Sequence, residues 1–298
     1  RRRARLGVKV DADGGVHLGF RARHSHRLVD IDACTVLVPA LDALSQLMVR
    51  QEQLEPARVL LQDAVERLGL SRESGPLLYR LGHVFERLGR DEEGYRYLMD
   101  ALRLDPQNLH LRVAVGQNRF RAERWREALR HLQELREHPE LREAPRVAAE
   151  AMYAAGVCEA ALRRPGGGES YFQLALELDP EHLETLSALA DAARTGGQHE
   201  RAAELSERLL ARLEDGERKN TLLKQLGDLY HGELGQVERA AECYAQLFVR
   251  LDRDEEAALL ELLPGILPVL REAGRHEGAA QVAEALAEIM MGEAEKRD

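Results

Sequence analysis

The stretch that decides the fold runs from Leu77 to Pro106 and reads LLYRLGHVFERLGRDEEGYRYLMDALRLDP. Apolar residues recur in it every three or four positions, which is the period of a helix with one buried face. Gly89 interrupts the pattern near its middle, where a residue in the left-handed conformation can end one helix and let the chain reverse. Pro106 ends the second run, because proline cannot continue a helix. The stretch therefore predicts two helices joined by a tight turn.

Small and large side chains follow a fixed order in this stretch. Small residues at positions 8, 20 and 27 let two helices approach closely, and large residues at positions 4, 7, 11 and 24 fill the space between them. This order resembles the tetratricopeptide repeat, a helical hairpin of about 34 residues that stacks into solenoids. The residues that carry the resemblance are Gly82 at position 8, Phe85 at 11, Gly89 at 15, Leu98 at 24, Ala101 at 27 and Pro106 at 32.

The same pattern recurs along most of the chain. Position 8 returns at spacings of 34, 40, 34 and 37 residues, and weaker units flank the clear ones at residues 41–70 and 257–289. Such hairpins bury their apolar faces by stacking on their neighbours. We therefore predict an all-α solenoid of about seven tetratricopeptide-like hairpins over residues 39–298. The clear position-8 residues are Gly82, Gly116, Gly156, Ala190 and Gly227.

Two features depart from the regular pattern. The glycine run at 166–168 falls where the second helix of one hairpin should begin, and each glycine costs a helix roughly 1 kcal/mol relative to alanine. We expect that helix to begin late, near Glu169 or Ser170. At the other end, residues 295–298 resemble the opening of the repeat at 217–220, so we expect the natural protein to continue beyond residue 298.

The first 38 residues have a different character. They carry eight basic and four acidic side chains, whereas the whole chain has a net charge of −10. The runs RRARLGVKV and VHLGFRA alternate apolar and polar residues on either side of DADGG, which is typical of a β-hairpin, and a third short strand is expected at 27–31. We therefore predict a separate basic β-hairpin element over residues 1–38, ahead of the repeats at 39–298.

Residues 1–45 resemble part of the RNA uracil-5-methyltransferase family. The resemblance rests on the Arg-rich strand, the strand that contains Gly19 and Phe20, and the segment VDIDACTVL. In some family members the cysteine that matches Cys34 is a ligand of an iron–sulfur cluster. The other three cluster cysteines, the methyl-donor motif and the catalytic cysteine have no counterpart here. The resemblance thus implies a non-catalytic accessory or remnant region.

The sequence contains little that indicates catalysis. It lacks the H-E-x-x-H, C-x-x-C, G-x-S-x-G, phosphate-loop and dinucleotide motifs, so we predict no enzyme activity, no catalytic residue and no cofactor. His24, His26 and Cys34 form its only compact set of soft metal ligands, but a fourth ligand is not evident and no metal site is predicted. Carboxylates such as Glu127 and Glu134 have Arg residues three or four positions away, which predicts surface ion pairs within each helix.

Two compositional features bear on where the protein works. The three cysteines are widely spaced and form no disulfide framework, which favours a reducing compartment. No apolar run reaches the length of a membrane span. We therefore expect a cytoplasmic protein without a membrane partner.

The candidate site is the surface that the first helices of successive hairpins share. In tetratricopeptide arrays, positions 2, 5, 9, 12 and 13 of that helix line a concave groove. Here they combine aromatic rings with Arg side chains, as interface hot spots do, and Val113 and Val157 accompany them. Packing in the repeat core is an equal alternative for Phe120 and Tyr153. The predicted partner-binding residues are Tyr79, His83, Arg87, Gln117, Phe120, Arg121 and Tyr153.

The leading hypothesis is a protein–protein interaction scaffold whose groove takes a partner with acidic and apolar side chains. The later grooves are polar and mixed in charge, so we expect the hot spot in the first half of the array. The alternative is an accessory of RNA modification in which residues 1–38 contact RNA; the acidic remainder is not expected to bind nucleic acid. The identity of the partner and the oligomeric state stay open.

Overall fold

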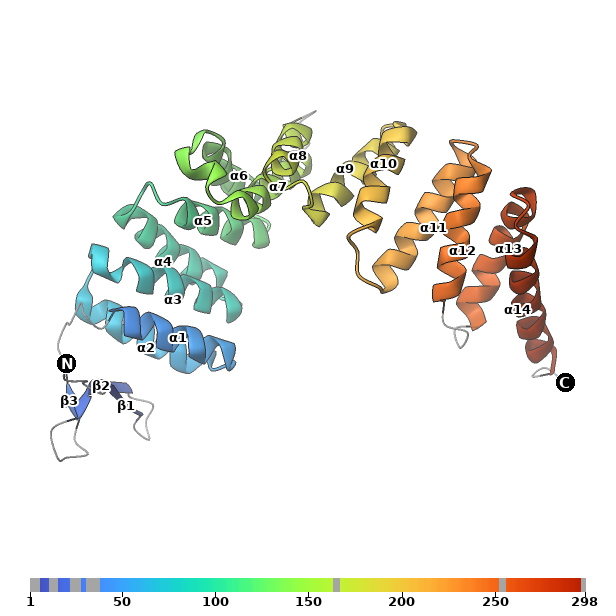
Figure 1. Ribbon diagram of the computed structural model, residues 1–298. Coiled ribbons are helices and arrows are strands. Elements are labelled where there is room, and N and C mark those ends of the chain that lie inside the picture. Colours follow the sequence, from blue (N-terminus) through green and yellow to red (C-terminus); the bar gives the residue numbers. More distant parts are fainter. Residues whose placement is uncertain are drawn as a thin grey trace, which may run out of the picture. The chain divides into compact units, whose positions relative to one another are not determined.

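The computed structural model of the chain describes residues 6–10, 16–21, 28–30, 38–162, 167–251 and 256–295. Helices account for nearly all of these residues, and consecutive helices pack in pairs (Figure 1). The chain divides into two compact units, residues 1–178 and 179–298. Each unit contains a row of helical hairpins, so the predicted helical-repeat architecture is confirmed.

Three short strands precede the helices of the first unit. Strand β1 (Leu6–Val10) pairs antiparallel with β2 (Val16–Arg21), and β2 pairs antiparallel with β3 (Leu28–Asp30). The register sets Val8 opposite Leu18 and Phe20 opposite Val29. The strands thus follow one another in the order β1-β2-β3 across a single sheet.

The helices of unit 1 form four hairpins in the part of the chain that the structure describes. Proline begins two of the first helices, since Pro76 and Pro145 lie in the first turn, where a missing N–H costs nothing. The Asn108 side chain caps a third by accepting a hydrogen bond of 3.2 Å from the Leu111 N–H. The helices are α1 (Val38–Arg50), α2 (Leu54–Leu68), α3 (Gly75–Arg87), α4 (Asp91–Leu104), α5 (Leu109–Arg121), α6 (Trp125–Gln133), α7 (Pro145–Ala161) and α8 (Gly167–Leu178), with short 3-10 turns at Arg72–Ser74, Glu134–Glu137 and Pro139–Arg142.

Unit 2 repeats the arrangement with three hairpins over its described residues. Its core is continuous from Ala193 to Val282 and is built mainly from Leu and Ala side chains. The first helix of the last hairpin continues through Pro264 and Pro268 without a break. The helices are α9 (Leu183–Thr195), α10 (His199–Leu210), α11 (Glu217–Gly232), α12 (Val237–Arg250), α13 (Glu256–Glu272) and α14 (His276–Glu295).

Glycines allow the two helices of a hairpin to touch backbone to backbone. A Cβ added to Gly94 on α4 would lie 2.9 Å from the Gly82 carbonyl oxygen on α3. The same relationship holds between Gly168 and Gly156, where the distance would be 2.8 Å. Such contacts are closer than real Cβ atoms make, so both positions require glycine.

The predicted start of α8 was wrong, and the packing of Gly168 explains why. The helix begins at Gly167, two residues before the earlier of the expected starts at Glu169 or Ser170. Gly168 is the small residue at position 20 of its repeat, and its close approach to α7 stabilises a helical turn that its propensity alone would disfavour.

The turns that the structure describes inside the other six hairpins contain a left-handed residue. Gly89, Gly197 and Gly274 supply it with φ near +70°, at 71°, 71° and 68°. In two hairpins the left-handed position of the turn is occupied by a glutamate, Glu52 with φ 59° and Glu123 with φ 55°. A side chain in this region is strained by roughly 1–2 kcal/mol, so packing on both sides of these turns holds them in place.

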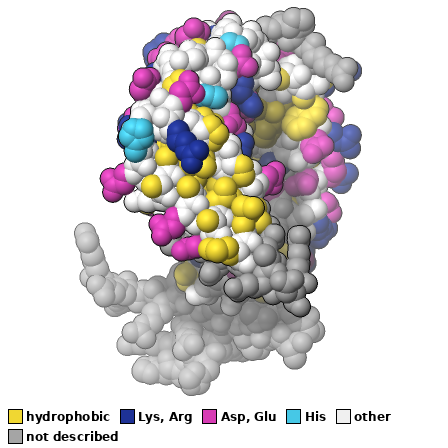
Figure 2. Space-filling model, turned by 90° about the vertical axis from the view of Figure 1, so that its right-hand side faces the viewer, with side chains coloured by type: hydrophobic (Ala, Val, Ile, Leu, Met, Phe, Trp, Pro, Cys, Tyr) yellow, Lys and Arg dark blue, Asp and Glu magenta, His cyan; other side chains and the backbone are white. Residues whose placement is uncertain are grey.

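The last hairpin leaves apolar side chains in contact with solvent. Met290 and Met291, on α14, are 59% and 61% exposed. Figure 2 looks toward this end of the second unit and shows hydrophobic side chains gathered between acidic ones. Among the residues that the structure describes, no helix is long and apolar enough to cross a bilayer.

Candidate protein-binding surface

The seven predicted groove residues all lie on first helices of unit 1, and none is buried. Tyr79, His83 and Arg87 lie on α3, Gln117, Phe120 and Arg121 on α5, and Tyr153 on α7. Arg87 and Arg121 are exposed and the other five are partly exposed. Val113, which the sequence placed beside them, is 3% exposed and packs in the core, so that assignment was wrong.

The Glu86 carboxylate joins the predicted residues of α3 to those of α5. It lies 2.7 Å from His83 Nδ1 and 2.6 Å from Arg121 Nη2, and its side chain is only 7% exposed. Asn118 donates a third hydrogen bond to it at 2.6 Å. Burial alone would raise the pKa of this carboxyl, but the hydrogen bonds from His83 and Asn118 and the charge of Arg121 lower it below 4.5. Glu86 therefore stays ionised and fixes two of the predicted side chains.

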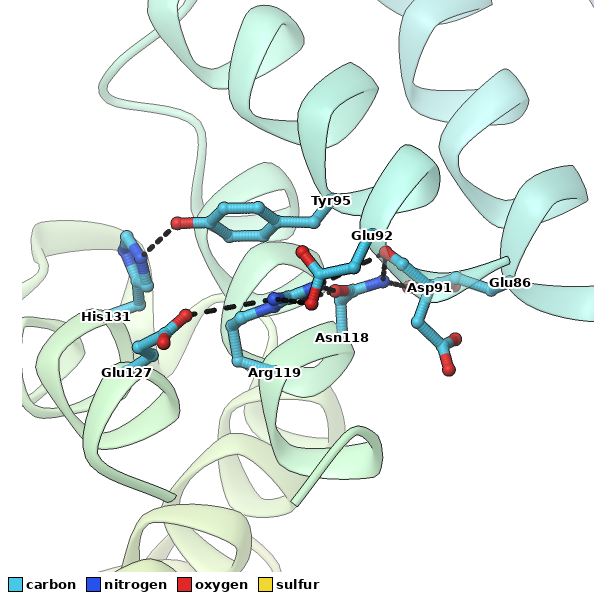
Figure 3. Close-up of polar contacts among 8 residues, drawn as sticks. All are labelled: Glu86, Asp91, Glu92, Tyr95, Asn118, Arg119, Glu127 and His131. Carbon is cyan, nitrogen blue, oxygen red and sulfur yellow. Dashed lines mark hydrogen bonds and ion pairs between the residues drawn. The ribbon is translucent and has the colours of Figure 1, made fainter. Parts of the chain in front are cut away.

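A buried arginine continues this network toward α4 and α6 (Figure 3). The side chain of Arg119 is 2% exposed and lies over the Tyr95 ring, with its guanidinium carbon 3.9 Å from the ring centroid. It donates to Asn118 Oδ1 at 2.7 Å and to Glu92 at 2.9 Å, and the Glu127 carboxylate lies 3.7 Å away. A buried cation needs such complete pairing, because an unpaired one would be strongly destabilising.

His131 closes the network at its far end. The Tyr95 hydroxyl lies 3.4 Å from His131 Nε2 in Figure 3. Burial lowers the pKa of His131 below its usual 6.5, so the ring is neutral at pH 7. Because His131 is neutral, the buried part of the network carries its positive charge on Arg119. Arg121, which pairs with Glu86, lies at the exposed edge.

The remaining predicted side chains contact different neighbours. Arg87 donates to the Val49 carbonyl at 2.9 Å and to Glu52 at 2.6 Å, which ties α3 back to the preceding hairpin. Phe120 packs edge-on against Trp125, with centroids 5.5 Å apart, and Tyr153 lies 6.0 Å from Phe172. The structure thus brings His83 and Arg121 together at Glu86, with Tyr79 against the His83 ring. Arg87, Phe120 and Tyr153 lie in separate contacts.

Tyr79 borders a hollow of about 570 Å³ between α3, α4 and α5. Its ring meets His83 edge-on with centroids 4.5 Å apart, and burial raises the pKa of its hydroxyl, so the phenol stays neutral. Leu104 and Leu111 supply apolar lining, and Arg72 and His110 supply polar groups at the margin. A hollow of this size with mixed lining is typical of ligand and peptide sites.

The sequence did not reveal Glu86, Asn118 and Arg119 as the residues that organise this surface. Charged residues on amphipathic helices are normally solvated, and nothing in the local pattern marks Arg119 as buried. The prediction that Glu127 and Glu134 pair with Arg residues of their own helices was also wrong, because both carboxylates pair with Arg residues elsewhere. Glu127 pairs with Arg119, and Glu134 pairs with Arg112, both of which lie on α5.

The described residues show no reactive thiol and no metal cluster. Burial raises the pKa of Cys158 to about 12 and that of Cys243 to about 11, so neither is a ready nucleophile at neutral pH. No group of three or more metal-ligating side chains occurs among the residues whose placement the structure gives. The candidate set of His24, His26 and Cys34 lies outside those residues.

Comparison with known proteins gives two separate results. The family model for the tetratricopeptide repeat matches residues 75–108, which are helices α3 and α4 with their turn. The chain is also 42% identical over 124 residues to a 23S rRNA (uracil(1939)-C(5))-methyltransferase RlmD from Halomonas elongata, over 41% of this chain and 23% of that protein. The RlmD of Chromohalobacter salexigens is 68% identical over 44 residues, 15% of this chain and 9% of that protein. The chain therefore spans less than a quarter of the length of these relatives.

Solved structures resemble the chain in fold. Pseudomonas aeruginosa pilF superposes with a TM-score of 0.59 at 18% identity, over 71% of this chain and 90% of that one. A tetratricopeptide repeat protein from Parabacteroides merdae gives 0.53 at 19% identity, over 85% and 98%. Identities this low bear on the fold alone. The chain thus carries a tetratricopeptide repeat at residues 75–108, set within helical hairpins that share the fold of tetratricopeptide-repeat proteins.

Proposed function

We propose that this protein is an interaction scaffold whose first unit binds a segment of a partner protein across α3 and α5. The observation that carries the proposal is the position of Tyr79, an aromatic ring at the edge of a hollow beside a fixed polar network. A ring held in one orientation loses little entropy when it is covered by a partner. The repeat matched by the family model is the one that presents this ring.

The charges of this surface suggest which partner side chain it takes. Arg121 is neutralised by the nearly buried Glu86, whereas Arg87 pairs with Glu52, whose side chain is 72% exposed. Exposed ion pairs are worth only about 0–1 kcal/mol, so a carboxylate on the partner can replace Glu52 at Arg87. The proposed ligand therefore offers an apolar group to Tyr79 and an acidic group to Arg87.

Affinity purification tests this proposal. The wild-type chain and the double variant Tyr79→Ala, Arg87→Ala are used as baits, and bound proteins are quantified by mass spectrometry. Arg126→Ala, an exposed arginine on α6, is the matched control. The proposal expects partners that the double variant loses and the control keeps. Equal recovery by all three baits, with helicity unchanged, would show that the surface is not the binding site.

The similarity to RlmD supports a second candidate function. We propose as the alternative that residues 1–38, which carry the basic excess of the chain, form a separate element that contacts RNA in an accessory role without catalysis. Contacts to phosphates release counterions, so the affinity should fall steeply between about 50 and 200 mM salt. RNA binding that persists unchanged after deletion of residues 1–38 would exclude this role.

The free thiols of Cys158 and Cys243 support a cytoplasmic setting for the scaffold. Disulfides are rare in reducing compartments, where unpaired cysteines persist. We therefore propose a cytoplasmic location for the scaffold, which fractionation of the source cells would check.

A further inference from the structure

Unit 2 contains a hollow of its own. It lies between α9 and α11, with α10 as its floor, and has a volume of about 400 Å³. Ser187 and Arg194 line it from α9, Thr221 and Gln225 from α11, and Ser206 from α10. The sequence had favoured binding in the first half of the array alone.

The hollow coincides with a missing core side chain. Position 24 carries the large residue that fills the space beneath the first helix in most hairpins of this chain, although the last hairpin has Ala283 there. That position is occupied by Leu61, Leu98, Leu132, Phe172 and Tyr244 in five of the other hairpins, and all five are buried. In the hairpin α9–α10 the residue at this position is Ser206, which is 8% exposed.

The neighbouring positions fill only part of the space. Ala190 stands where four of the other hairpins have glycine, but its methyl group is smaller than a leucine or an aromatic side chain. Ala190 and Ala202, at positions 8 and 20 of the same repeat, are also small and line the same hollow. In the next hairpin, by contrast, the Tyr244 ring lies so close to Gly227 that a Cβ there would be 2.5 Å from it. Where Ala190, Ala202 and Leu209 line the hollow, the missing side chain leaves apolar groups without dispersion contacts, and a ligand group can restore them.

The rim of the hollow has no net charge. Arg194 is paired with Asp191 at 2.7 Å, and Arg218 and Glu217 lie next to one another at the start of α11. Ser187, Thr221 and Gln225 offer hydroxyl and amide groups that can bond to a peptide backbone. A charged ligand would find no unbalanced charge here, whereas an uncharged polar segment would find partners.

We propose that unit 2 has its own docking pocket, which takes one large apolar side chain from an extended, uncharged segment of a partner protein. The incoming leucine or aromatic side chain occupies the space that Ser206 leaves at position 24. From residue 218 to residue 229 the pocket follows α11 for about 16 Å, the length of roughly five residues of extended chain. This pocket is separate from the surface at Tyr79 and prefers a different ligand, so it goes beyond the function proposed above.

The substitution Ser206→Leu tests the proposal because it supplies the missing side chain from within. It should raise the melting temperature, since the leucine buries apolar surface in the space that Ala190 and Ser206 leave open. Ser206→Ala leaves the hollow open and is the matched control. A second pair, Gln225→Trp at the rim and Gln281→Trp on α14, separates blocking of the pocket from the effect of an added tryptophan.

The probe is a displayed library of ten-residue peptides with capped ends, selected on the full chain. The expected winners have near-zero net charge and one Leu, Phe, Tyr or Trp. Their affinity should fall at least tenfold with Ser206→Leu and Gln225→Trp and change less than twofold with Ser206→Ala, Gln281→Trp or the Tyr79→Ala, Arg87→Ala double variant.

Three outcomes would overturn the proposal. The first is equal binding by Ser206→Leu and Ser206→Ala. The second is a lower melting temperature for Ser206→Leu, which would mean that no space exists for the leucine. The third is self-association of the wild-type chain that Ser206→Leu abolishes, since the occupant would then be a second copy. Loss of binding with the Tyr79→Ala, Arg87→Ala variant alone would instead support only the surface on unit 1.

Discussion

The guanidinium of Arg121 on α5 lies 2.6 Å from the carboxylate of Glu86 on α3. This contact joins the first helices of two successive hairpins, and the same carboxylate also accepts a hydrogen bond from the buried Asn118. The exposed edge proposed to bind a partner and the interior of the second and third hairpins are therefore joined through one side chain.

Glu86→Gln should destabilise unit 1 at neutral pH by roughly 1–3 kcal/mol, the range for hydrogen bonds to a buried charged group. The folded-state pKa of Glu86 lies below 4.5, so its stabilisation is present above that pH and is lost as the pH falls through the folded-state value. Urea unfolding at a series of pH values measures the effect. Wild type and variant should converge in acid, and a constant difference down to pH 3 would contradict the role given to the ionised carboxylate.

Gly156→Ala should destabilise the hairpin α7–α8 by roughly 1–3 kcal/mol, the usual cost of overpacking. The new Cβ would lie 2.5 Å from the Phe172 ring and 3.0 Å from the Gly168 carbonyl, and neither can move freely. Gly265→Ala, within α13 and with no atom inside 4 Å of the new Cβ, should instead be neutral or stabilising. Thermal melts of the two variants check this contrast, which would disappear if the helices of the hairpin were not in close contact.

Glu123→Gly should stabilise the protein by up to about 1 kcal/mol. Glu123 has φ 55°, a conformation that glycine adopts without strain, and the gain is reduced by the greater freedom of glycine in the unfolded chain. Gly89→Glu, at φ 71° in the preceding hairpin, should have the opposite effect. Denaturant midpoints of both variants test the pair, and a loss of stability with Glu123→Gly would show that the glutamate side chain itself holds the turn.

The thiols of Cys158 and Cys243 should resist alkylation in the folded protein. Burial raises the pKa of the two thiols to about 12 and about 11, so little thiolate exists at pH 8. Peptide mapping after iodoacetamide treatment should find both sites unmodified without urea and fully modified with it. Rapid modification of Cys158 in the native protein would mean that α7 opens easily.

Sequence features within single repeats were enough to predict most of the helical hairpins. The 3.6-residue period, the turn glycines and the small residues at positions 8 and 20 located the hairpins, because each reflects a local backbone requirement. The start of α8 was missed because the glycine cost was counted within one helix, whereas Gly168 acts through its contact with Gly156. The turns at Glu52 and Glu123 likewise depend on packing that no single-residue preference reveals.

The surface was predictable only in part. Position within the repeat identified side chains that are indeed at least partly exposed, from Tyr79 to Tyr153. It could not show that Glu86 neutralises Arg121 or that Arg119 is buried over Tyr95, since those contacts join helices more than 20 residues apart in the chain. The pocket at Ser206 could have been found from the sequence, because a serine stands where the repeat requires a large residue.

Hydrogen–deuterium exchange of the wild-type chain, with and without a bound peptide, tests the central claim most directly. The ligand is the tightest binder from a second library, whose ten-residue peptides all carry acidic and apolar side chains. The account predicts that bound peptide slows exchange in α3 and α5, around residues 79–87 and 117–121, and that Tyr79→Ala with Arg87→Ala removes this protection. Protection confined to other helices, or unchanged in the double variant, would contradict the assignment of the binding surface to unit 1.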